Sequence, residues 1–89
     1  MKTYRSRLKI VLDILKAIEE GEDRVTRILL YANLSHERLV KYLDELVEKG
    51  LIETVEGGGR IYRLTEKGYR FLRELERAEK LAEAFGFRL

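Results

Sequence analysis

Residues 41–68 of the chain read KYLDELVEKGLIETVEGGGRIYRLTEKG. A segment of helical periodicity leads into two runs rich in β-branched and aromatic residues, 51–56 and 60–64, neither of which contains proline. Three consecutive glycines separate these runs, and glycine readily adopts the positive φ of a hairpin turn. A phosphate-binding loop would instead require a Lys-Ser/Thr pair after the glycines and then a helix. The stretch therefore predicts a helix followed by a β-hairpin with a cationic tip.

The length and composition indicate one small folded domain. The chain has 89 residues, of which 45% are apolar and 38% charged, and this balance is typical of a folded rather than a disordered protein. Lys9, Asp13 and Lys16 interrupt the first apolar stretch, so it predicts an amphipathic helix and not a signal peptide or membrane span. We therefore expect a cytoplasmic protein without a membrane partner. The charge-rich, cysteine-free composition resembles that of hyperthermophile proteins.

The charge distribution is more informative than the net charge of +2. Residues 1–9 contain four basic side chains and no acid, and residues 57–73 contain five basic side chains and one acid. Residues 19–23 form a compensating block of four acids. Because one basic segment includes the expected hairpin tip, the pattern favours a polyanionic partner.

The first helix is predicted over residues 4–20. It ends at Gly21, which suits the left-handed position beyond a helix C-terminus. A short β segment is expected at 24–26. The apolar stripe of the helix consists of Leu8, Val11, Leu12, Leu15 and Ile18.

Two further helices are expected with a tight turn between them. Thr26 is predicted to cap a helix over 27–32, and Asn33 tolerates the left-handed backbone that ends it. Ser35 is predicted to cap the next helix, 36–49, so about three residues separate the two. This spacing is that of a helix-turn-helix.

The helix 36–49 has an unusual charge order on its polar side. Arg38 and Lys41 lie in its first half, whereas a helix dipole by itself favours acids there and bases at the far end. Its second half carries Asp44, Glu45 and Glu48. Its predicted buried side consists of Leu39, Val40, Leu43, Leu46 and Val47. The order indicates a helix whose N-terminal half meets an anion.

Thr65 is predicted to cap a last helix that reaches residue 84. Its apolar stripe could pack on the first helix of the same chain or on a second copy. We expect the second arrangement, because three helices and a hairpin already form a core. The predicted interface residues are Phe71, Leu72, Leu75, Ala78, Leu81, Ala82 and Phe85. On this view 1–64 forms the helical body with its hairpin and 65–89 the dimerisation helix, giving an α+β, mainly α fold.

This order of elements resembles the winged helix-turn-helix superfamily, in which a "GLI" opens the hairpin and "Y-x-LT-x-x-G" closes it. More narrowly, "VTRILLYANLS", "KYLDEL" and "YRLTEKG" are similar to the ArnR-like winged-helix proteins of archaea. These include ten-kilodalton chromatin-associated proteins that dimerise through a C-terminal helix. The resemblance covers roughly residues 4 to 85 and implies a homodimer bound to double-stranded DNA, with 1–64 as the winged helix-turn-helix DNA-binding domain.

Arg38 and Lys41 are the main candidates for contacts in the major groove, because the first turns of the second helix meet base edges in this docking mode. Four neighbouring residues admit either a structural role or a DNA contact: Ser35, His36, Glu37 and Tyr42. The resemblance further implies that the wing 57–63 contacts the backbone or minor groove, and that the start of the helix 27–32 lies beside a phosphate. The residues it implicates are Arg27, Gly58, Arg60 and Arg63.

The residue types argue against an enzyme, a metal site or a cofactor. The chain has no cysteine and one histidine, and no acid pair is forced into proximity by spacing. The resulting hypothesis is a dimeric, nucleoid-associated transcriptional regulator. Two alternatives stay open: a non-specific architectural chromatin protein, and a winged-helix module that binds another protein.

Overall fold

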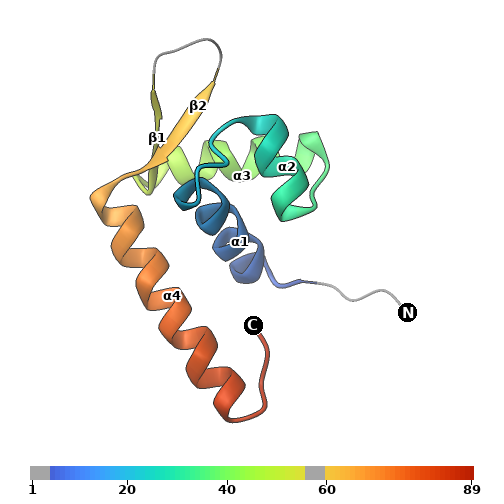
Figure 1. Ribbon diagram of the computed structural model, residues 1–89, viewed down its shortest axis with the longest axis vertical. Helices are drawn as coiled ribbons and strands as arrows, with labels where there is room; N and C mark the ends of the chain where they lie inside the picture. Colours follow the sequence, from blue (N-terminus) through green and yellow to red (C-terminus); the bar gives the residue numbers. More distant parts are fainter. Residues whose placement is uncertain (1–4, 56–59) are drawn as a thin grey trace.

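The computed structural model describes residues 5–55 and 60–89. Its elements, in chain order, are α1 (Arg7–Glu19), α2 (Val25–Ala32), α3 (His36–Glu48), β1 (Ile52–Val55), β2 (Ile61–Leu64) and α4 (Glu66–Ala84). Figure 1 shows α1 near the centre, the hairpin β1–β2 projecting at one end of the molecule and α4 extending toward the other. The predicted α+β, mainly helical architecture is confirmed.

The helix α1 forms the centre of the core and packs against α2, α4 and β2. It begins three residues later than predicted, because the Ser6 hydroxyl accepts a hydrogen bond of 3.0 Å from the backbone N–H of Lys9 and caps it there. Gly21, at φ +96°, follows its end as expected. The fully or nearly fully buried residues of α1 are Ile10, Leu12, Ile14, Leu15, Ala17 and Ile18.

The start of α2 differs from the prediction. The helix begins at Val25 with Arg24 in the N-cap position, so Thr26 lies inside the first turn and is not the cap. Arg24 forms an isolated antiparallel bridge with Ile61, and the neighbouring N–H of Tyr62 donates to Asp23 O at 2.9 Å. These bonds to β2 hold the backbone extended only as far as Arg24. The predicted β segment is thus reduced to one bridging residue.

The turn between α2 and α3 agrees with the prediction. Asn33 adopts the left-handed conformation at φ 54° and ψ 56°, and the N–H of Leu34 donates to Leu29 O at 3.2 Å. The Ser35 hydroxyl then accepts from the N–H of Arg38 at 3.3 Å and caps α3. Outside the turn, the Arg5 side chain donates to Asn33 O at 3.0 Å and pairs with Asp13 at 2.9 Å. Arg5 therefore ties the start of α1 to the helix-turn-helix.

The two strands pair antiparallel, with Ile52 opposite Leu64 and Val55 opposite Ile61. Ile52, Tyr62 and Leu64 are buried in the core, which anchors the base of the hairpin against α1 and α3. Because β1 begins almost directly after α3 ends, the hairpin rises from the C-terminal end of that helix (Figure 1).

Gly68 and Thr65 join α4 to the base of the hairpin. The Thr65 hydroxyl donates to Gly50 O at 2.6 Å and accepts from the N–H of Gly68 at 3.0 Å. A Cβ atom on Gly68 would lie 1.9 Å from the carbonyl oxygen of Leu51. The glycine of the "YRLTEKG" motif is therefore required by the close approach of two backbones.

The first half of α4 packs on α1 of the same chain. Leu72 is 0% exposed and Leu75 is 6% exposed, and both belong to the same core cluster as the buried residues of α1. Lys9 of α1 donates to Glu79 at 2.7 Å, and this bond raises the pKa of Lys9. The prediction of an intermolecular role is corrected for Leu72 and Leu75, because α1 presents enough apolar surface to bury them.

Candidate nucleic-acid interface

The outward side of α3 carries cations in its first half. Arg38 and Lys41 are both exposed, and within residues 5–55 and 60–89 the Arg38 side chain has no ion-pair or hydrogen-bond partner. Lys41 lies 3.8 Å from Glu37, with both side chains largely exposed, and such pairs are weak. These two cations are therefore available to an anion from outside the chain. The prediction that Val47 belongs to the buried side of this helix was wrong, because Val47 is exposed.

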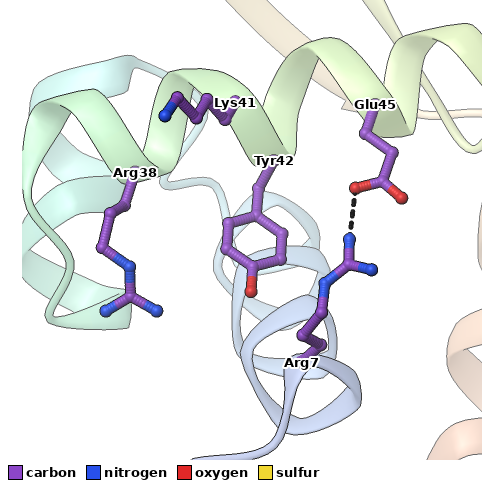
Figure 2. A pocket seen from close by; sticks show the side chains of 5 residues that line it. All are labelled: Arg7, Arg38, Lys41, Tyr42 and Glu45. Atoms are coloured by element: carbon purple, nitrogen blue, oxygen red, sulfur yellow. Dashed lines mark hydrogen bonds and ion pairs between the residues drawn. The ribbon is translucent and has the colours of Figure 1, made fainter.

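A hollow of about 310 Å³ lies between α3 and the first turn of α1. Figure 2 shows the five residues that line it: Arg7, Arg38, Lys41, Tyr42 and Glu45. The Tyr42 ring stands between the side chains of Arg38 and Arg7 in this view and packs against the core. Three cations and one acid thus surround one aromatic ring.

Arg7 was not among the residues predicted from the sequence. Its guanidinium lies 2.6 Å from a Glu45 carboxylate oxygen, and its central carbon is 5.7 Å from the centroid of the Tyr42 ring. The hydrogen bond to Glu45 raises the pKa of Arg7. The acid-free run at residues 1–9 was the available signal, but it did not indicate which of its cations reaches α3.

The other residues predicted around the N-terminus of α3 fall into two groups. Ser35 and Tyr42 have structural roles as a helix cap and as a packing residue, which are among the alternatives stated for each. His36 and Glu37 are exposed in the first turn, and His36 does not lie against the core. A carboxylate at Glu37 is favourable near the helix N-terminus.

The predicted wing residues are exposed where the structure describes them. Arg63 pairs with Glu53 across the hairpin at 2.6 Å, whereas Arg60 has no ion-pair partner within residues 5–55 and 60–89. Gly58 lies outside the described residues. Arg27, at the start of α2, is exposed and lies 3.1 Å from Glu22. To contact DNA, Arg27 and Arg63 would have to leave these carboxylates for a phosphate, or bind the carboxylate and the phosphate at the same time.

The second half of α4 carries apolar side chains that the rest of the described chain leaves uncovered. Leu81 is 63% exposed and Phe85 is 74% exposed. Ala78 is exposed, Ala82 half-buried, and Phe71, nearer the start of the helix, packs partly on the core. The predicted interface residues thus separate into a buried group near α1 and an exposed group at the end of α4.

Residues 5–55 and 60–89 contain no cluster of three or more His, Cys, Asp or Glu side chains able to hold a metal ion. The same ranges contain no helix with the length and hydropathy needed to span a membrane.

Comparison with known proteins places this geometry in a family. The model of the Winged helix-turn-helix family matches residues 4–83. The uncharacterized protein MJ0287 of Methanocaldococcus jannaschii is 37% identical over 71 residues, which cover 80% of this chain and 73% of that protein. A second protein of that organism, MJ0290, is 31% identical over 77 residues, and the match spans 86% of this chain but 35% of the longer relative.

Two solved structures share the fold. Sso10a-2, a DNA-binding protein from Sulfolobus solfataricus, matches with a TM-score of 0.79 and 31% identity, covering 91% of this chain and 85% of that chain. The MarR family transcriptional regulator SPO1453 from Silicibacter pomeroyi matches with a TM-score of 0.72 over 88% of this chain and 57% of its own. Its 19% identity shows the common fold alone. The chain therefore belongs to the winged helix-turn-helix family.

Proposed function

We propose that this protein is a homodimeric regulator of transcription that binds double-stranded DNA. The first half of α3 enters the major groove, where Arg38 and Lys41 meet base edges and phosphates. The hairpin lies along the backbone or the minor groove, with Arg60 and Arg63 as its contacts. The similarity to Sso10a-2, a DNA-binding protein, supports this proposal.

The observation that carries the proposal is the exposed side chain of Arg38 on the first half of α3, which has no ion-pair partner in the part of the chain that the structure describes. A cation without an internal partner retains its whole charge for an external anion. The acids Asp44 and Glu48 occupy the outward side further along α3. Repulsion from phosphates would tilt this second half away from the duplex, so that the N-terminal turns enter the groove.

The affinity of the protein for DNA should fall steeply as the salt concentration rises. If three or four cations of each protomer neutralise phosphates, a plot of log K against log salt concentration should have a slope of about −5 to −7 for the dimer. Fluorescence anisotropy with a labelled random-sequence duplex at several salt concentrations measures this slope. A slope near zero would contradict binding through the DNA backbone.

The dimer contact is proposed for the end of α4. Leu81 and Phe85 are exposed beyond the part of the helix that packs on α1, and Figure 1 shows α4 extending away from the body. A second copy of the same helix would cover these apolar side chains. The two α3 helices of the dimer would then enter successive major grooves, about 34 Å apart.

The second prediction tests this contact. The double substitution Leu81→Ser with Phe85→Ser should shift the protein from twice the 10.5 kDa chain mass toward the monomer in sedimentation equilibrium. The circular dichroism spectrum should be unchanged, because neither side chain belongs to the core. Leu30→Ser is the matched control, since Leu30 is 84% exposed on α2. A monomeric wild-type protein would refute the dimer while leaving DNA binding untouched.

The two alternative functions lead to different measurements. A single protected palindrome in a footprint indicates a regulator, whereas uniform coating of random duplex indicates an architectural protein. An exposed acidic block at residues 19–23 would favour the protein-binding alternative, because a basic protein partner could recognise it. In the structure Glu19 pairs with Arg73, and Glu22 pairs with Arg27. These internal pairs reduce the acidity that a protein partner could recognise.

A further inference from the structure

Arg7 is held at the edge of α3 from both ends. Arg7 is the first residue of α1, and Ser6 caps that helix. The side chain of Arg5 anchors the preceding segment to Asp13 and Asn33. Its guanidinium is held by Glu45 and lies over the Tyr42 ring. The side chain is nevertheless 72% exposed. An arginine that is both accessible and already oriented loses little conformational freedom when it binds a ligand.

The hollow beside Arg7 has an excess of positively charged side chains. Arg7 and Arg38 face it from two different helices, and Lys41 lines the same hollow. Glu45 is the one acid among the residues that line it within the described parts of the chain. Three cations against one acid leave a local excess of two positive charges. Phosphate is the anion that suits this arrangement, because the planar guanidinium binds its oxygens with two parallel hydrogen bonds.

We propose that Arg7 is a DNA-backbone contact and that Glu45 occupies the position of the phosphate until DNA binds. This inference rests on the proposed function, since it assumes that α3 faces the duplex. A phosphate beside the groove entered by Arg38 would then be bound by the first turn of α1. The guanidinium exchanges the Glu45 carboxylate for a phosphate oxygen, and Tyr42 keeps it oriented during the exchange.

The opposing interpretation is that Arg7 and Glu45 form a structural ion pair with no role in binding. Both interpretations predict weaker binding for Arg7→Ala, because any lost cation lowers the attraction to DNA. They differ for the double variant Arg7→Ala with Glu45→Gln, which has the net charge of the wild type. A purely electrostatic pair predicts wild-type affinity for this double variant, whereas a phosphate contact predicts lower affinity.

The experiment compares wild type, Arg7→Ala, Glu45→Gln and the double variant with one duplex over a series of salt concentrations. We expect Arg7→Ala to weaken binding about tenfold and to make the salt slope less negative by about 0.9 for each protomer. Glu45→Gln should strengthen binding, because it removes the competing carboxylate. The double variant should stay severalfold weaker than the wild type.

The matched control is the pair Glu74 and Arg77 on α4, which lie 3.7 Å apart and are exposed. The variant Glu74→Gln with Arg77→Ala should bind like the wild type. Thermal melts will show that each variant is folded, since exposed ion pairs contribute little to stability. If the wild type binds DNA and the Arg7/Glu45 double variant matches it, the inference is overturned while the proposed function stands. If the wild type does not bind, both are overturned.

Discussion

Replacing Gly68 with alanine is expected to destabilise the protein by about 3 kcal/mol, because the new methyl group collides with a backbone that cannot move aside. The Cβ would lie 1.9 Å from the oxygen and 2.9 Å from the carbon of the Leu51 carbonyl. Leu51 O also accepts a hydrogen bond from the N–H of Thr65 at 3.1 Å, so moving it would break the junction between hairpin and α4.

The sign of this effect makes the test decisive. At an ordinary helical position, replacing glycine with alanine stabilises a protein by roughly 0.5–1 kcal/mol. Urea unfolding followed by circular dichroism measures the change, with Glu74→Ala at an exposed position of α4 as the control. The control should remain within about 0.5 kcal/mol of the wild type. A Gly68→Ala protein as stable as the wild type would show that the two backbones do not approach as closely as described.

The second large effect is expected at Arg38. Replacing it with alanine should remove about 1–3 kcal/mol of discrimination between a preferred duplex and its single-base variants, as expected for an arginine that reads a base edge. The preferred duplex is obtained by selection from a random pool, and binding of each variant is then measured at one salt concentration. The loss should be concentrated at one or two base positions in each half-site.

Arg60→Ala is the informative comparison for Arg38→Ala. Arg60 is exposed directly before β2 and is proposed to contact the backbone or the minor groove, so its removal should weaken binding to all duplexes by a similar factor. Arg77→Ala on α4 controls for the loss of one positive charge. If Arg38→Ala also weakened every duplex equally, Arg38 would be a backbone contact and would not determine sequence preference.

The features of the fold that were predicted correctly depend on short-range interactions. Asn33 ends α2 because its own backbone adopts the left-handed conformation. Ser35 begins α3 because its side chain accepts a hydrogen bond from the backbone N–H three residues later. Thr65 caps α4 in the same way. The hairpin followed from two β-rich runs on either side of glycines. Such elements can be read from neighbouring residues alone.

Most of the incorrect or missing predictions involve residues that meet across the chain, and the late start of α1 at the Ser6 cap is a local exception. Thr26 has the chemistry of a cap, but the pairing of Arg24 with β2 decided where α2 begins. Leu72 and Leu75 were assigned to a second copy because helical periodicity shows that a stripe is apolar without showing what covers it. Arg7 lies in the basic segment 1–9, and the sequence does not show that its side chain reaches Glu45 of α3, 38 residues further along the chain.

The sequence by itself determined the order of the elements, the turn at Asn33, the caps Ser35 and Thr65, and the placement of Arg38 and Lys41 on the polar side of a helix, because these follow from local geometry and periodicity. Only the tertiary structure decided that the first half of α4 covers α1, that Gly68 must lack a side chain, and that Arg7 reaches Glu45 beside the Tyr42 ring. Those outcomes depend on which surfaces pack together, and that choice is made by the whole core.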